Sequence, residues 1–238
     1  VFMIGWLILA AVLALCAVLC IRAARFKPEA GAGAAPTPVA VDTEGAVQRL
    51  AQLVRIPTVS NYDAEKFDET QFEGFREKLR ELYPRVHEMC PPVRIAHTGM
   101  LFRWKGKSSA APVVLMAHYD VVPVNENEWQ EPPFGAVVKD GELWGRGTLD
   151  TKGTLHGVME AAEMLIGQGF VPENDVYFAF GGDEEIFGGD APAIVEELKK
   201  RGIHPEFVLD EGGAIVDGVF PGVSKSAALI GTDRKSTR

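Results

Sequence analysis

One histidine and several carboxylates follow the apolar segments of the sequence, and side chains of these types can together bind metal ions. His118 and Asp120 come directly after the most hydrophobic segment, 113–117, which is typical of a buried strand. Three further acidic groups follow other apolar segments in the same way: Asp150, the run 183–185 (Asp183, Glu184 and Glu185), and Asp210 with Glu211. Mixed imidazole and carboxylate ligands suit zinc, with cobalt or manganese as alternatives. Several carboxylates with few histidines favour two metal ions, about 3.5–4 Å apart, that share a carboxylate and activate a water.

Each of these groups also has an ordinary structural explanation when it is taken alone. Asp150 could cap a helix that begins near Thr151, and the acids at 183–185 could lie in a solvated turn or at a helix N-terminus. Together, however, crowded carboxylates repel one another and raise each other's pKa, a cost that a bound cation removes. Calcium is a weaker candidate, because the chain has no EF-hand spacing and His118 is an unusual ligand for a hard cation.

The elements that must position these side chains alternate between helices and strands. Apolar spacing predicts helices at 47–54, 72–82, 155–166 and 194–198, and strands at 94–104, 112–117, 143–144, 175–180, 206–210 and 226–231. This alternation predicts an α/β fold with a mostly parallel sheet covered by helices on both faces. In such sheets, ligands bind outside the carboxyl ends of the strands, where all four polar groups fall. The dinucleotide fingerprint and the P-loop are absent.

The N-terminal segment differs in composition from the rest of the chain. Residues 1–21 carry no charge and are followed by Arg22, Arg25 and Lys27. We expect residues 1–21 to be a transmembrane helix or signal anchor, with a cleaved signal peptide and a buried helix as alternatives. Residues 22–41 are expected to be a Pro-, Ala- and Gly-rich linker, and 42–238 the globular part. Basic residues after a span favour a cytoplasmic location for that side, so the topology stays open.

The charge of the chain argues against one class of partner. The formal net charge is −9, and no basic stripe interrupts the acidic globular part. Nucleic acid is therefore not an expected partner.

Four motifs together resemble one family of enzymes. They are "HYD" (118–120), "GRGTLDTKG" (145–153), "GGDEEIFGG" (181–189) and "LDEGG" (209–213). In order and approximate spacing they resemble the zinc aminoacylase/carboxypeptidase family, which includes aminoacylase, carboxypeptidase G, carnosinase and Gly-X carboxypeptidase. The resemblance covers about residues 43–230, and the charge-free start with "TLDTKG" and "LDEGGAI" looks most like the branch of Gly-X carboxypeptidase and a secreted N-fatty-acyl-amino-acid hydrolase.

The resemblance implies a role for each candidate residue. His118 would bind one zinc ion, Asp120 would orient His118, Asp150 would bridge both ions, Glu184 would be the general base, Glu185 would bind the second ion, and Asp210 would complete the first site, with Glu211 as the fallback. The implied reaction is hydrolysis of a C-terminal peptide bond or an N-acyl amino acid by a water activated between two zinc ions. The catalytic domain would be extracytoplasmic and held at the membrane by residues 1–21, or secreted after signal cleavage.

The sequence departs from the family in length. Family members carry an inserted lid domain and a later histidine ligand, so we expect residues 42–238 to be the N-terminal part of a catalytic domain, inactive alone, with a homodimer contact in the lid. The alternative function is an inactive, membrane-tethered metal-binding or interaction module. A serine hydrolase is not supported, because no GxSxG motif occurs.

Overall fold

The computed structural model describes residues 2–25, 39–212, 214–216, 218 and 227–229. The chain divides into two compact units, residues 1–41 and 42–238. The expected linker falls mostly at 26–38 and therefore lies outside the described residues.

The first unit contains the helix α1 (Phe2–Arg25). Its segment Met3–Arg25 is long and apolar enough to cross a membrane by length and composition, a test that a signal sequence also passes. The helix extends through Arg22 and Arg25, four residues beyond the expected end of the span.

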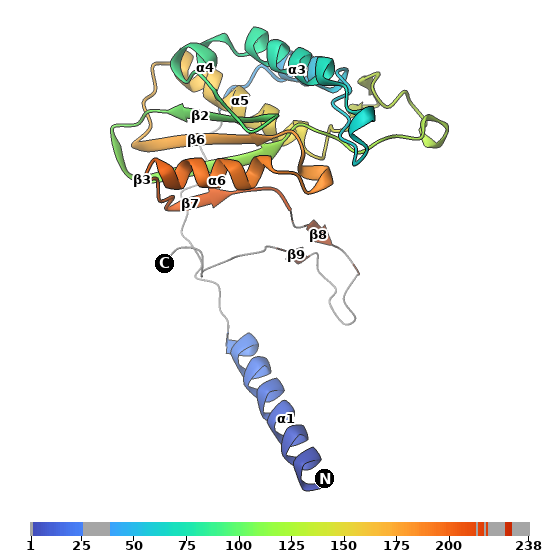
Figure 1. Ribbon diagram of the computed structural model, residues 1–238, viewed down its shortest axis with the longest axis vertical. Coiled ribbons are helices and arrows are strands. Elements are labelled where there is room, and N and C mark those ends of the chain that lie inside the picture. The colour runs from blue at the N-terminus through green and yellow to red at the C-terminus, as the bar shows by residue number, and fades with distance from the viewer. Residues whose placement is uncertain (1, 26–38, 213, 217, 219–226, 230–238) are drawn as a thin grey trace. The chain divides into compact units, whose positions relative to one another are not determined.

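The second unit is built on a five-stranded sheet (Figure 1). Its strands are β1 (Val93–Ile95), β2 (Gly99–Trp104), β6 (Asn174–Gly181), β3 (Ser108–His118) and β7 (Phe207–Leu209), in that spatial order. The strand β3 runs parallel to both β6 and β7, whereas β2 pairs antiparallel with β6 and with β1. The α/β prediction is confirmed, and the sheet is mixed, with its parallel part formed by β6, β3 and β7.

The antiparallel edge arises from a turn that the sequence pattern did not reveal. Residues 94–104 were expected to form one strand, but they form the end of β1, a turn and β2. Ala96 has a φ of 51°, in the left-handed region, which reverses the chain. The Asp190 carboxylate accepts a hydrogen bond from the Thr98 backbone N–H at 3.3 Å and a short one from its hydroxyl. This distant partner stabilises the turn, so local periodicity could not predict it.

Helices cover both faces of the sheet. On one face lie α2 (Thr43–Val54), α3 (Glu69–Leu82), α4 (Pro84–Met89) and α5 (Lys152–Gly167), and on the other lies α6 (Asp190–Lys200) (Figure 1). Successive residues of β2 point to opposite faces, so Phe102 packs in the core under α3 and α5 while Leu101 packs under α6. These two cores hold the sheet between the helical layers and fix its carboxyl edge.

The remaining elements are short. Three 3₁₀ helices, η1 (Ala64–Lys66), η2 (Glu126–Glu128) and η3 (Glu184–Ile186), lie in loops. The strands β4 (Val137–Lys139) and β5 (Glu142–Trp144) form a hairpin, and β8 (Ala214–Val216) pairs with β9 (Ala227–Leu229). The helix α2 begins at Thr43, four residues before the helical spacing at 47–54, because the Asp42 carboxylate caps it by accepting the Gly45 N–H at 3.0 Å.

Candidate metal centre

Parallel pairing brings the polar groups to one edge of the sheet. His118 is the last residue of β3, Glu184 and Glu185 follow the carboxyl end of β6, and Asp210 and Glu211 follow that of β7. Because β6, β3 and β7 run in the same direction, their carboxyl ends lie side by side. The loop between β5 and α5 brings in the fourth group, Asp150.

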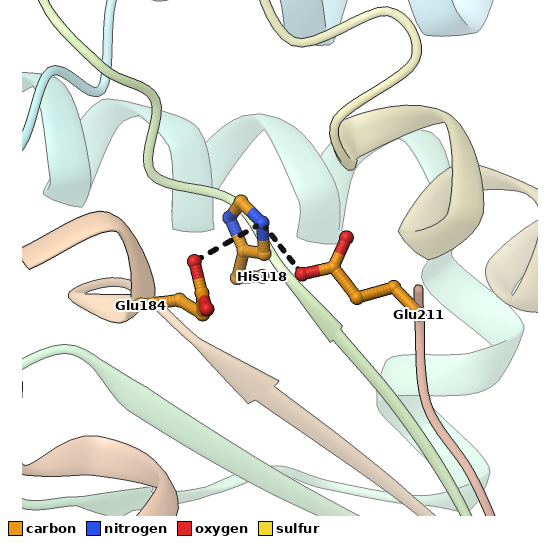
Figure 2. A group of neighbouring side chains, drawn as sticks. All are labelled: His118, Glu184 and Glu211. Carbon is orange, nitrogen blue, oxygen red and sulfur yellow. Dashed lines mark ion pairs between the residues drawn. The ribbon is translucent and has the colours of Figure 1, made fainter. Parts of the chain in front are cut away.

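The imidazole of His118 is the centre of the cluster. Its side chain is only 3% exposed, and Nε2 faces three carboxylates. Nε2 lies 3.0 Å from Asp150 Oδ1, 3.1 Å from Glu211 Oε1 and 3.7 Å from Glu184 Oε2. Figure 2 shows the ring between Glu184 and Glu211, with the side chains arriving from different strand ends. This nitrogen is therefore the one available to a metal ion.

Two overlapping sets of side chains have donor atoms close enough to hold an ion. Within the described residues, one set is His118, Glu184 and Glu211, and the other is His118, Asp150 and Glu185. In each set the donor atoms lie within 4.8 Å of one another. Imidazole nitrogen with carboxylate oxygen is a donor combination that suits zinc.

The carboxylate of Asp120 contacts both His118 and the turn that carries Glu184 and Glu185. It is fully buried, and its Oδ1 lies 3.2 Å from Nδ1 of His118, which also lies 3.0 Å from the Asp120 carbonyl oxygen. The same carboxylate accepts the backbone N–H groups of Glu184 and Glu185, each at 3.1 Å. Asp120 thus contacts the histidine ring, for which the resemblance implies an orienting role, and also fixes the acidic turn. The second contact was not predicted, because spacing cannot show which backbone amides a carboxylate will meet.

Burial and mutual repulsion oppose the ionisation of the acids. Burial would lower the pKa of His118, but the hydrogen bond and charge of Asp120, with the charge of Glu211, raise it to about 9. Burial and the charges of Asp150, Glu184 and Asp210 raise the pKa of Glu211 to about 6, although the charge of His118 acts in the opposite direction. Burial and Asp150 also raise the pKa of Glu185. A bound cation would favour the ionised form of each of these acids.

Asp210 lines the same cavity as His118 and Glu211 but contributes no donor atom to either set. Its Oδ1 accepts the backbone N–H of Glu211 at 2.9 Å. The fallback residue, Glu211, lies beside His118 instead. Both residues follow β7, and which of two adjacent side chains turns inward depends on the backbone after the strand.

Asp150 does not serve as a helix cap. The N-cap of α5 is Thr151, and no side chain accepts a hydrogen bond there. The carboxylate of Asp150 instead lies against His118. In the neighbouring turn Asp183 has a structural part, because it accepts the backbone N–H groups of Gly189 at 2.7 Å and of Asp190 at 3.2 Å.

Lys152 is a buried charged residue near the centre that the sequence analysis did not single out. It is completely buried, and its ammonium donates to the carbonyls of Leu53 at 3.2 Å and Ile56 at 2.6 Å. Burial lowers its pKa to about 7, although the charge of Asp120 raises it. The contact joins the end of α2 to the start of α5, two residues after Asp150. A signal existed, since Lys152 lies at helical spacing before the apolar stripe of α5.

Comparison with known proteins identifies a family and several similar proteins. Residues 114–225 match the family model "Peptidase family M20/M25/M40". Among curated proteins, the chain is 39% identical over 195 residues to the probable carboxypeptidase S-like 2 of Dictyostelium discoideum, covering 79% of this chain and 38% of that protein. It is 38% identical over 200 residues to the N-fatty-acyl-amino acid synthase/hydrolase PM20D1 of Xenopus tropicalis, covering 80% of this chain and 38% of that protein. The chain thus spans about two fifths of the length of these relatives.

Solved structures show the same fold. The M20 family metallo-carboxypeptidase Sso-CP2 of Sulfolobus solfataricus aligns with a TM-score of 0.56 at 23% identity, covering 73% of this chain and 38% of that one. Human carnosine dipeptidase 1 aligns with a TM-score of 0.56 at 19% identity, covering 74% and 42%.

The helix-covered mixed sheet is thus a fold that this chain shares with the M20 family metallo-carboxypeptidase Sso-CP2. Residues 114–225 form a domain of the peptidase family M20/M25/M40.

Proposed function

We propose that this chain is part of a metal-dependent hydrolase that cleaves a C-terminal peptide bond or the amide bond of an N-acyl amino acid, with a water activated between two zinc ions. One observation carries the proposal: the carboxylates of Asp150, Glu184 and Glu211 all lie near the buried Nε2 of His118. Relatives named as carboxypeptidases and as an N-fatty-acyl-amino acid synthase/hydrolase support the reaction class.

The residues present fit a pair of divalent ions. Asp150 would contact both ions, because its carboxylate lies 3.0 Å from Nε2 of His118 and shares a donor set with Glu185. The raised pKa values of Glu185 and Glu211 record the repulsion that a cation would relieve. We assign Glu211 rather than Asp210 to the ion bound by His118, because Glu211 faces the imidazole. Cobalt or manganese would suit the same donors.

Each protein group then has a defined task. When bound, the ions would lower the pKa of a water to about 7 and polarise the scissile carbonyl. We assign Glu184 as the base, the role that its motif implies, because its carboxylate is the farthest of the three that face Nε2 of His118, at 3.7 Å. Its neighbour Glu185, in contrast, shares a donor set with Asp150. It accepts the proton of the attacking water and returns it to the leaving nitrogen. Asp120 keeps the proton of His118 on Nδ1, so that Nε2 keeps its lone pair for the metal.

The wider features of the protein are part of the proposal. The helix α1 would hold the protein at a membrane, with the catalytic domain outside the cytoplasm, or would be removed as a signal. A lid domain and a homodimer contact would lie outside this chain, and the chain alone would hydrolyse substrate poorly. An inactive binding module has no support from the relatives described above, whose names are those of enzymes.

Zinc binding and hydrolysis test the proposal separately. In calorimetry with the 238-residue chain, Glu184→Gln should bind zinc nearly as well as the unmodified chain, whereas His118→Ala should lose at least tenfold in affinity. In a protein extended to the length of the relatives, Glu184→Gln should abolish hydrolysis of N-acyl amino acids. Full activity of Glu184→Gln would refute its role as the base.

A further inference from the structure

A cavity lies beside the metal centre, and Asp150 belongs to both. Its volume is about 360 Å³, and its walls come from the loop after η2, from β5 and from the turn that follows β5. The lining side chains that concern us are Trp129, Trp144, Arg146, Leu149 and Asp150. None of the roles assigned above uses the first four.

Arg146 is an unusual arginine in this acidic protein. Several others pair with carboxylates, as Arg49 does with Glu160 and Arg103 with Asp175. Arg146 forms no ion pair with any described residue, although Asp150 lines the same cavity. Its Nε is shielded from solvent and makes no hydrogen bond within the described part of the chain. The guanidinium therefore has no direct carboxylate partner among the described residues, although Glu142 and Asp150 also line the cavity.

Aromatic stacking and a tight turn hold this charge in place. The guanidinium carbon lies 5.1 Å from the centre of the Trp129 ring, a cation–π contact that orients the flat group. The Arg146 N–H donates to the carbonyl of Pro133 at 2.7 Å. A Cβ on Gly147, whose φ is +87°, would lie 2.8 Å from Val121, so the turn packs without room for a larger residue. A preorganised guanidinium loses little freedom when it binds an anion.

We propose that this cavity binds a carboxylate, with Arg146 as its ion-pair partner and the two tryptophans contacting the apolar part of the same ligand. A guanidinium fork matches a carboxylate in a bidentate geometry, and tryptophan presents a flat apolar surface. The cavity holds a small organic acid rather than a macromolecule, since its volume is about 360 Å³. Resting on the proposed function, the carboxylate is that of the amino-acid part of the substrate, whose amide then lies toward Asp150.

Hexanoate and hexanamide form a matched pair of probes that differ in charge and not in size. Each is titrated into the 238-residue chain in zinc-containing buffer, and the indole N–H signals of Trp129 and Trp144 are followed by NMR. We expect hexanoate to shift both signals and to bind about tenfold or more tightly than hexanamide, the usual effect of one charge-assisted contact. In Arg146→Gln this preference should vanish, and Arg146→Lys should keep only part of it.

Lys139→Gln is the matched control, because it removes one positive charge from the neighbouring hairpin, where Lys139 pairs with Glu131. It should leave hexanoate binding unchanged. Three results would overturn the proposal. The two probes could bind equally, neither indole signal could respond, or the preference for hexanoate could survive Arg146→Gln because the carboxylate binds zinc instead. If Arg146→Gln does not fold, Arg146→Lys serves instead, and a preference for hexanoate that is not reduced in this variant would overturn the proposal. Hexanoate has no amide bond, so its binding does not depend on hydrolysis. If hexanoate binds as expected but a protein extended to the length of the relatives hydrolyses no N-acyl amino acid, the proposed function is refuted and this inference stands.

Discussion

Replacing Asp120 with asparagine should lower the pKa of His118 from about 9 to near or below its ordinary value of 6.5. Asp120 is the main group that raises this pKa, through its 3.2 Å contact with Nδ1 and through its charge, while burial of the ring acts in the opposite direction. At about 1.4 kcal/mol per unit, the rise in pKa corresponds to roughly 3 kcal/mol in favour of the charged imidazole. Asparagine keeps the shape but loses the charge, so burial should dominate.

NMR titration of the imidazole in the metal-free chain measures this pKa directly, with His118→Gln to assign the signal. Asp183→Asn is the control, because it removes a nearby charge from a residue that binds backbone amides of α6 and does not contact the ring. An unchanged pKa in Asp120→Asn, or an equal decrease in Asp183→Asn, would refute the role assigned to Asp120.

Three further predictions concern metal uptake and stability. Because the pKa of His118 is about 9 without metal, zinc binding should displace about one proton at neutral pH. The affinity of the chain for zinc should also rise from about pH 6 toward pH 9. Calorimetry in buffers of different ionisation enthalpy measures the released proton, and finding none would contradict this. Burial lowers the pKa of Lys152 to about 7, so between about pH 7 and 10.5 the unfolded chain holds a proton that the folded chain lacks. In this range the unfolding free energy of the unmodified chain, relative to that of Lys152→Met, should therefore rise with pH. Denaturant titrations that show a constant difference would count against this. Gly147→Ala should destabilise the chain by about 2 kcal/mol or more in thermal unfolding, because φ is +87° and the new Cβ would meet Val121, whereas Gly157→Ala on α5 meets nothing within 4 Å and should be neutral or stabilising.

The parts of the fold that follow from local sequence were predictable. The apolar run before His118 identified β3, and helical spacing identified α5 with its buried Leu155 and Met159. The hairpin of β1 and β2 was not predictable, because the left-handed Ala96 and the Asp190 contact with Thr98 leave no mark on local periodicity.

The candidate site divides in the same way. The parallel-strand rule correctly placed His118 beside the acids that follow β6 and β7. It does not explain Asp150, which was expected after a strand of the same sheet but follows β5 of a separate antiparallel hairpin and reaches His118 through the loop before α5. Spacing could not decide between Asp210 and Glu211, because that depends on backbone geometry after β7. Arg146 escaped notice for a related reason: only the three-dimensional arrangement shows that it lacks a carboxylate partner among the described residues.

Anomalous diffraction at the zinc edge, from crystals of this chain grown with zinc, tests the central claim most directly. The account predicts a zinc peak about 2.0–2.1 Å from Nε2 of His118, with Asp150 among its ligands, and a second peak about 3.5–4 Å away on the side of Glu185 at sufficient zinc. Absence of any peak at this nitrogen, or a peak only at surface groups far from the carboxyl ends of β3 and β6, would contradict it.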